Sequence, residues 1–238
     1  MCIRDRKDLY GRVARLLNKA QGRRLTSVEC CLLIDEAAVT IVAGNIRRSA
    51  GMRQFASDDQ AAASSKDNLW QQDEEGNWRI DPERDALRMA NHTRVYHTRP
   101  SKDVVHAAVT KQFHSGEGAI QFAPEAIARS NADLLTTLEL RTEFIEIYCD
   151  QGREEAGRWL SDNHGPIGAD ELEHRLSRYG LNPCGEILGA DFHCNLAEVH
   201  LNQIDPSDEE GQADAFRAGA LSVCLLYTSP SPRDRVRS

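Results

Sequence analysis

One short stretch bears most directly on the fold and chemistry of this chain: Asn182-Pro183-Cys184-Gly185-Glu186-Ile187. Pro183 fixes its own φ angle and lacks a backbone N–H, whereas Gly185 permits backbone angles that other residues avoid. The pair predicts a tight loop that holds Cys184 forward, with Asn182 and Glu186 beside it. In such a loop Glu186 is a candidate general base, and Asn182 is a candidate partner for a substrate hydroxyl.

The cysteine of this loop is expected to react as a neutral thiol. A hydrolytic cysteine needs a nearby basic group that favours the thiolate. Glu186 would instead raise the pKa of the Cys184 thiol, because a second negative charge so close is unfavourable. Hydrogen-atom transfer therefore remains open to Cys184, and Cys194 is a candidate source of reducing equivalents if a second thiol lies opposite it. The competing interpretation makes each of them an ordinary packing residue.

Zinc binding is another chemistry that these thiols offer. The candidate ligands are Cys184, His193, Cys194 and His200. Their spacing lacks the Cys-x-x-Cys knuckle of structural zinc sites, so we predict no metal site. A non-catalytic nucleotide- or zinc-binding module that uses Cys184 and Cys194 is kept as the alternative function.

The composition is that of an ordinary folded protein. The 238 residues are 40% hydrophobic and 28% charged, with a net charge of -8 and seven cysteines. No apolar run approaches the roughly 20 residues that cross a membrane, and the first residues do not form a secretory signal. The acidic balance argues against binding to nucleic acid. The cysteines are too few for a disulfide scaffold, which favours a reducing, cytoplasmic location.

Alternating helices and short strands predict an α/β fold. Helices are expected at 28–46, 83–90, 102–113, 124–129, 142–160 and 169–178, and extended segments at 93–97, 119–122 and 199–201. The polar residues 57–82 are predicted to form a surface excursion. Cys30, Cys31 and Cys149 fall on the expected helices and are interpreted as packing residues.

A basic loop, 46–53, follows the first of these helices. Thr26 or Ser27 is expected to cap that helix, and Gly44-Asn45 is expected to end it. The candidate nucleotide-binding residues of the loop are Arg47, Arg48, Ser49, Ala50, Gly51 and Arg53. Arginines among small residues suit contact with a phosphate or a base, although a solvated turn has the same composition.

Both ends of the chain resemble translated adaptor sequence. Cys2–Arg6 can be encoded by TGTATAAGAGACAG followed by a purine, and Cys224–Thr228 by TGTCTCTTATACACA. Preceded by a C, the second contains the reverse complement of the first, and both are similar to a transposase end used in sequencing libraries. We therefore predict that 1–6 and 224–238 are artefacts and that 7–223 is the genuine segment. The alternative is a natural, flexible tail.

Several motifs together resemble one family, the ribonucleotide reductases. Asn182–Ile187, with a second cysteine ten positions after the first, resembles their finger loop, and its Pro-Cys-Gly form resembles the adenosylcobalamin-dependent class. Phe192–Glu198 and Gly116–Phe122 resemble the monomeric branch that reduces triphosphates. Gly44–Ala50 resembles the loop that links allosteric specificity to the substrate base. The resemblance covers most of the genuine segment.

The resemblance implies a barrel and a radical mechanism. Residues 7–223 would be a middle section of an α/β barrel whose central finger loop carries the active-site cysteine. Cys184 would bear a thiyl radical that removes the ribose 3′-hydrogen, with adenosylcobalamin as the source of the radical. Glu186 would deprotonate the 3′-hydroxyl, and Asn182 would bind the ribose hydroxyls. Cys194 would be one of two thiols oxidised to a disulfide as the 2′-hydroxyl leaves as water.

The resemblance also implies partners and an incomplete site. The partners would be a ribonucleoside triphosphate substrate, a deoxyribonucleoside triphosphate effector and a thioredoxin-like reductant, in a monomeric cytoplasmic enzyme. No residue before Arg47 matches the other reducing cysteine of the family, and the C-terminal half of the barrel has no counterpart in this sequence. We therefore expect the chain to be inactive by itself.

Overall fold

In a computed structural model, residues 3–39, 51–183, 185–187 and 197–228 are described. The chain divides into two compact units, 1–189 and 190–238. Helix α1 begins at Ile3 and α9 ends at Thr228. The predicted boundaries at 1–6, 7–223 and 224–238 and the adaptor assignment stay predictions.

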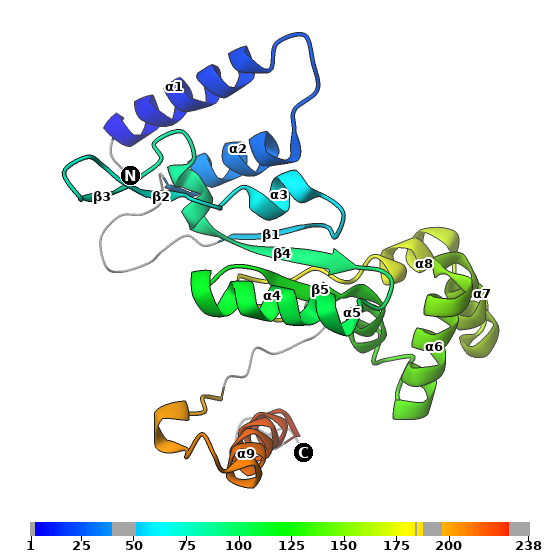
Figure 1. Cartoon of the computed structure of the whole chain (residues 1–238). Helices are drawn as coiled ribbons and strands as arrows, with labels where there is room; N and C mark the ends of the chain where they lie inside the picture. The colour runs from blue at the N-terminus through cyan, green and yellow to red at the C-terminus, as the bar shows by residue number, and fades with distance from the viewer. Residues whose placement is uncertain (1–2, 40–50, 184, 188–196, 229–238) are drawn as a thin grey trace, which may run out of the picture. The chain divides into compact units, whose positions relative to one another are not determined.

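The first unit is built around a parallel sheet of three strands, in the order β1 (Gly51–Ala56), β4 (Ala90–Tyr96) and β5 (Ala119–Phe122) (Figure 1). Gln54 of β1 pairs in register with Thr93 of β4, and Val95 of β4 pairs with Gln121 of β5. The helices that connect these strands make the unit mixed α/β, which confirms the predicted class. The complete barrel and its central finger loop stay predictions.

The register divides the strand residues between two faces of the sheet, because paired residues point the same way and successive residues point oppositely. One face, called here the loop face, carries Met52, Gln54, Asn91, Thr93, Val95 and Gln121. The opposite face carries Arg53, Phe55, His92, Arg94 and Ile120. Amides and a hydroxyl are thus concentrated on one side of a sheet type that is normally apolar on both faces.

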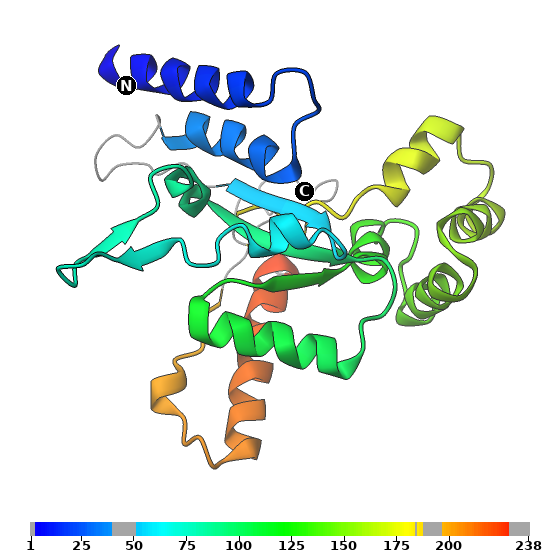
Figure 2. The same ribbon diagram turned by 45° about the horizontal axis from the view of Figure 1, so that its top comes forward.

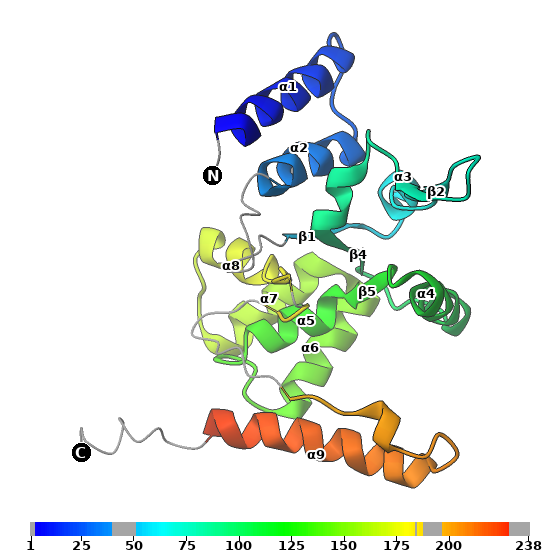
Figure 3. The same cartoon turned by 90° about the vertical axis from the view of Figure 1, so that its left-hand side faces the viewer.

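Two helices, α1 (Ile3–Lys19) and α2 (Ser27–Val39), lie side by side before the sheet (Figure 3). Thr26 caps α2 in a reciprocal arrangement: its Oγ1 accepts from the Glu29 N–H at 3.2 Å, and the Glu29 carboxylate accepts from the Thr26 N–H at 2.9 Å. The predicted capping by Thr26 is confirmed. The predicted end of this helix at Gly44-Asn45 falls outside the described residues.

The connection from β1 to β4 contains more structure than a surface excursion. It includes α3 (Gln60–Ser64), the antiparallel hairpin β2 (Trp70–Gln72) and β3 (Trp78–Ile80), and the 3₁₀ helix η1 (Asp85–Met89). The hairpin projects away from the sheet (Figure 2), as expected of exposed polar sequence. Ala62 is buried, however, so α3 belongs to the core, and the prediction of a surface excursion is wrong for α3. The buried Leu87 belongs to η1, which lies within the helix predicted at 83–90.

The segment from β4 to β5 follows the sequence prediction closely. Helix α4 (Lys102–Ser115) begins after Ser101, whose Oγ accepts from the Val104 N–H at 3.3 Å. The helix ends at Gly116, whose φ of 71° is the left-handed conformation favoured by glycine. The turn at Gly116 then leads directly into β5.

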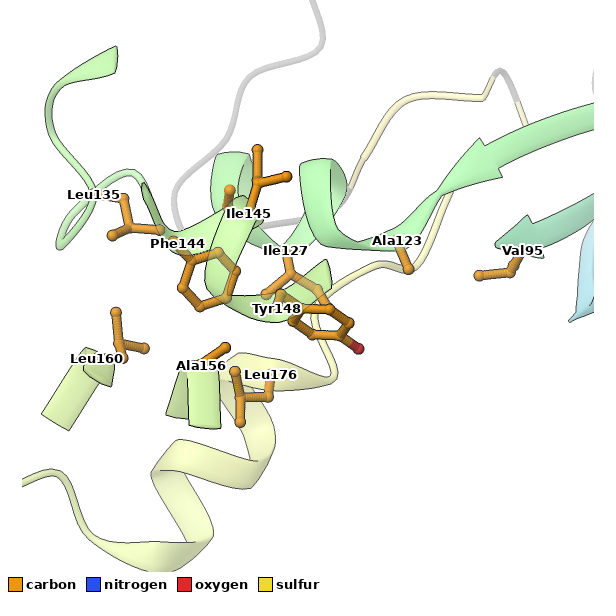
Figure 4. Close-up of a cluster of buried hydrophobic side chains, with 11 residues drawn as sticks. Val95, Ala123, Ile127, Leu135, Phe144, Ile145, Tyr148, Ala156, Leu160 and Leu176 are labelled. Carbon is orange, nitrogen blue, oxygen red and sulfur yellow. The ribbon is translucent and has the colours of Figure 1, made fainter. Parts of the chain in front are cut away.

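Four helices form a cluster after β5: α5 (Ala123–Ser130), α6 (Leu138–Gln151), α7 (Arg153–His164) and α8 (Ala169–Leu176). Phe144, Leu160, Ile127 and Leu135 meet between them, each with no exposed surface (Figure 4). The predicted single helix 142–160 is wrong, because Gly152 has a φ of 92° and separates α6 from α7.

The second unit contains η2 (Leu201–Gln203) and α9 (Glu209–Thr228). Asp208 caps α9 by accepting from the Gly211 N–H at 2.9 Å. The extended segment predicted at 199–201 is not a strand: residues 197–200 have no regular structure and Leu201 begins η2. Among all described residues, no helix combines the length and apolar character needed to cross a membrane.

Candidate functional site

The segment after α8 runs back along the loop face of the sheet and forms a closed loop (Figure 1). Leu181 and Ile187 pair as an isolated antiparallel bridge. The Asn182 N–H donates to the Glu186 carbonyl at 3.0 Å, and the Gly185 N–H donates to the Asn182 carbonyl at 2.9 Å. Asn, Pro and Gly at the first, second and fourth positions are typical of a type I turn. The predicted tight loop is therefore present, with Gly185 at a φ of 86°.

The side chains of Asn182 and Glu186 contact each other across this loop. The Asn182 Nδ2 donates to Glu186 Oε2, and the Glu186 N–H donates to Asn182 Oδ1 at 3.0 Å. Both side chains are half-buried. The Asn182 amide thus orients the Glu186 carboxylate through its NH₂ group and binds the Glu186 backbone through its oxygen. Cys184, which stands between them in the sequence, lies outside the described residues.

Three side-chain amides of the sheet bind the backbone of this segment. The Gln54 Nε2 donates to the Tyr179 carbonyl at 2.9 Å, and the Leu181 N–H donates to Gln54 Oε1 at 2.9 Å. The Gln121 Nε2 donates to the same Tyr179 carbonyl at 2.9 Å. Further along, the Asn91 Nδ2 donates to the Pro183 carbonyl at 2.5 Å. The segment is therefore attached to all three strands.

A cavity of about 310 Å³ adjoins the loop. Leu181 and Gly185 line it from the loop, and Met52, Asn91 and Thr93 line it from the sheet. Its volume is at the lower end of the range that encloses a small ligand. The Asn182–Glu186 pair and this cavity together make the loop the candidate site.

The candidate nucleotide-binding residues fall into two groups. Arg47, Arg48, Ser49 and Ala50 lie outside the described residues, as does Cys194. Gly51 and Arg53 belong to β1, so the prediction of a loop up to residue 53 is wrong. Gly51 pairs with Ala90 of β4, so the strand begins at Gly51, within the stretch that was predicted to be a loop.

Arg53 points to the opposite face of the sheet from the candidate site and forms an ion pair with Asp35 of α2. Asp35 has no exposed surface, and its burial raises the pKa of its carboxyl to about 6, although the Arg53 charge opposes this shift. Asp35 Oδ2 and Arg53 Nε are buried without a hydrogen-bond partner among the described residues. Arg53 thus serves the packing of α2 on β1, and its contact with a nucleotide stays a prediction.

The opposite face carries a second polar cluster and a cavity of about 630 Å³. His92 is buried, and desolvation lowers the pKa of its imidazole to about 4, so it is neutral at physiological pH. Lys66 pairs with Glu117 at 2.6 Å, and Lys111 pairs with Asp67 at 2.7 Å. These lysines are therefore neutralised by carboxylates of the same cavity.

The remaining cysteines of the described residues differ in their surroundings. Cys31 and Cys149 are partly buried against apolar clusters, and desolvation raises the pKa of both thiols, which confirms them as packing residues. Cys30 is exposed, so its assignment as a packing residue is wrong. Within the described part of the chain, no group of three or more His, Cys, Asp and Glu residues is placed to hold a metal ion.

Sequence reasoning missed Gln54, Asn91 and Gln121, the residues that hold the loop. What distinguishes these residues in the sequence is that each places an amide on the same face of the sheet, where a parallel sheet normally carries apolar residues. This feature becomes visible only when the register of the strands is known.

Comparison with known proteins shows similarity to a ribonucleotide reductase. The chain is 29% identical over 216 residues to an adenosylcobalamin-dependent ribonucleoside-triphosphate reductase of Levilactobacillus brevis. The aligned part is 87% of this chain and 22% of that protein, so the chain spans about a fifth of the length of the relative. No family model and no solved structure matches the chain.

Proposed function

We propose that this chain is a section of an adenosylcobalamin-dependent ribonucleoside-triphosphate reductase, which converts ribonucleotides to 2′-deoxyribonucleotides. The observation that carries the proposal is the hydrogen bonding between Asn182 and Glu186, the polar residues that flank Cys184 in the sequence. The similarity to the reductase of Levilactobacillus brevis extends over most of the chain and supports the same assignment.

The proposed roles are those that the resemblance to the reductases implies for the three loop residues. In the longer protein, Cys184 would first lose its thiol hydrogen to the radical that adenosylcobalamin supplies, and it would then remove and later return the ribose 3′-hydrogen. The Glu186 carboxylate would accept the proton of the 3′-hydroxyl. Asn182 orients Glu186 and binds a ribose hydroxyl. Cys194 and a second thiol of the longer protein lose two electrons and form a disulfide as the 2′-hydroxyl leaves as water. A thioredoxin-like dithiol then reduces that disulfide.

The segment 47–51, which leads into β1, is proposed to contact the nucleotides. Its residues Arg47, Arg48, Ser49, Ala50 and Gly51 would respond to a bound deoxyribonucleotide effector and adapt the site to the substrate base. The enzyme would act in the cytoplasm, where reduced thiols persist.

Adenosylcobalamin does not fit the residues that are described. Cavities of about 300–1,000 Å³ enclose drug-sized ligands, and a corrin ring with its nucleotide tail is larger than these. The cavity at the loop measures about 310 Å³, and the cavity on the opposite face is lined by ion pairs. The cofactor therefore belongs to the proposal for the longer protein, where it would supply the radical, and no described residue of this chain is assigned to hold it.

Cysteine variants of the longer protein test the proposal. With nucleoside triphosphate, adenosylcobalamin and a thioredoxin system, Cys184→Ser should lose all turnover, because serine cannot exchange a hydrogen atom as a thiol does. Cys194→Ser should complete at most a single turnover. Cys30→Ser, which alters an exposed thiol on α2, is the matched control and should keep full activity.

Repeated turnover by Cys184→Ser, measured as deoxyribonucleotide formed per enzyme, would refute the radical assignment. The 238-residue chain should form no deoxyribonucleotide from CTP under the same conditions, since it lacks a second reducing thiol in the position that the family uses.

A further inference from the structure

We infer that Gln54 and Gln121 are positioning residues, which set the place of the loop 181–187 above the sheet. The geometry of their amides supports this role, and its meaning for catalysis rests on the function proposed above. The inference concerns two strand residues whose side chains bind the backbone of Tyr179 and Leu181, just before the loop residues that carry the proposed chemistry.

The Gln54 side chain acts as a substitute for a neighbouring β-strand. Its Nε2 donates to the Tyr179 carbonyl and its Oε1 accepts from the Leu181 N–H, each at 2.9 Å. A strand neighbour would offer the same donor and acceptor to residues two apart. One amide therefore pairs with both the Tyr179 carbonyl and the Leu181 N–H. These two hydrogen bonds fix which residues of the segment lie opposite Gln54 and how far the segment lies from the sheet.

Gln121 determines which end of the Gln54 amide is the oxygen and which is the NH₂ group. The Gln54 Nε2 donates to Gln121 Oε1 at 2.5 Å, and the Gln121 Nε2 donates to the Tyr179 carbonyl. Because Oε1 of Gln121 accepts, the neighbouring group on Gln54 must be the NH₂ end. Reversing either amide would place two donors or two acceptors against each other. The Tyr179 carbonyl thus receives two N–H groups from two different strands.

The position of this attachment matters for the loop. Leu181, which Gln54 holds, is also the residue whose bridge to Ile187 closes the loop. A shift at Leu181 therefore displaces Asn182 and Glu186 together. Misplacement of reacting groups by about 1 Å can lower a rate about 100-fold.

Amide hydrogen exchange on the 238-residue chain tests the positioning directly. In Gln54→Met, which keeps the length of the side chain and removes its hydrogen bonds, the peptide 179–187 should exchange at least about fivefold faster than in the wild type. Gln121→Met should accelerate the same peptide less, because Gln54 still binds Leu181. The core peptide 144–149 of α6 should keep its wild-type rate in both variants.

Gln72→Met is the matched control. Gln72 also donates to a backbone carbonyl, that of Gly76 at 2.8 Å, but it does so in the exposed hairpin. It should leave the exchange of 179–187 unchanged. Equal rates in Gln54→Met and the wild type would overturn the inference. A uniform rise in 179–187 and 144–149 would also overturn it, because the glutamine would then support the whole fold and not the loop.

Kinetics of the longer protein test the catalytic meaning separately. Gln54→Met should lower kcat by about tenfold or more and leave KM within about threefold, because the loop is displaced while substrate binding elsewhere persists. An unchanged kcat would show that the attachment does not position the reacting groups. If the wild-type protein reduces no ribonucleotide, the proposed function fails, whereas the exchange experiment still decides whether the glutamines hold the loop.

Discussion

Arg53 and Gln54 are neighbours on β1 that bind different parts of the protein on opposite faces of the sheet. Arg53 forms a buried ion pair with Asp35 of α2, and Gln54 binds the backbone of Tyr179 and Leu181. Arg53 falls in the basic loop predicted from the sequence, and the sequence predicted no role for Gln54 beside it. Their environments depend on which elements pack against each face of the sheet. The residues next to them in the sequence do not reveal this packing.

Asp35 makes stability depend on pH in an unusual direction. Burial raises the pKa of its carboxyl to about 6 from an ordinary value of 3.8, so the folded protein retains a proton that the unfolded chain has released. Stability falls with rising pH wherever the folded state binds more protons. From about pH 4 to about pH 6, we therefore expect Asp35 to lower the free energy of unfolding by roughly 1–3 kcal/mol.

Urea unfolding of the wild type and of Asp35→Asn at pH 4, 5, 6 and 7 measures this contribution. The difference between the two free energies of unfolding should shift steadily against the wild type as pH rises to 6, and then level off. Curves that stay parallel across this range would contradict the prediction.

At the scale of secondary structure, the elements with local start and stop signals were predicted well. Ser101 and Gly116 define the ends of α4, and both signals operate within a few residues. The start of β1 at Gly51 was missed because its pairing with β4 is a tertiary interaction. The short η1 was expected as an α-helix, and its 3₁₀ form has no distinct sequence signal.

Gly152 separates α6 from α7 through its backbone conformation alone. Its φ of 92° and ψ of 173° lie in a region that is essentially restricted to glycine, while a Cβ added there would meet nothing within 4 Å. Gly152→Ala should therefore lower the free energy of unfolding by about 1–3 kcal/mol through strain and without a clash.

Chemical denaturation checks this value against a matched glycine. Gly168 also has open space around its Cβ position, but its φ is -59°. Gly168→Ala should change stability by less than about 1 kcal/mol. Equal effects of the two substitutions would show that the break between the helices does not depend on the conformation of Gly152.

At the scale of the first unit, the apolar cluster of α5 to α8 is expected to dominate stability. Phe144 has no exposed surface and packs beside Tyr148 (Figure 4). Its ring also lies close to that of Trp159. Phe144→Ala should lower the free energy of unfolding by about 3–5 kcal/mol, because it leaves a cavity in a packed core. Phe113 is 83% exposed, so Phe113→Ala should change stability by less than about 0.5 kcal/mol in the same denaturant titration. Similar losses for the two would contradict the assignment of the core.

The fold class and the residues of the loop were accessible from sequence, and the way the loop is held was not. Asn182, Pro183 and Gly185 carry a turn signature that depends on their own backbone properties. Gln54 and Gln121 acquire their role only when β4 brings β1 and β5 into one sheet. Two helices in place of the predicted one at 142–160 followed from a single glycine within otherwise helix-favouring sequence.

The attachment of the loop also bears on how the first unit folds. Gln54 and Tyr179 are 125 residues apart in the chain, whereas β4 and β5 are joined through one helix. Closing a loop of that length costs chain entropy before any hydrogen bond forms. The hydrogen bonds of Tyr179 and Leu181 therefore contribute only after β1, β4 and β5 have assembled. We therefore expect the segment 179–187 to become ordered late in folding, after the three strands have paired.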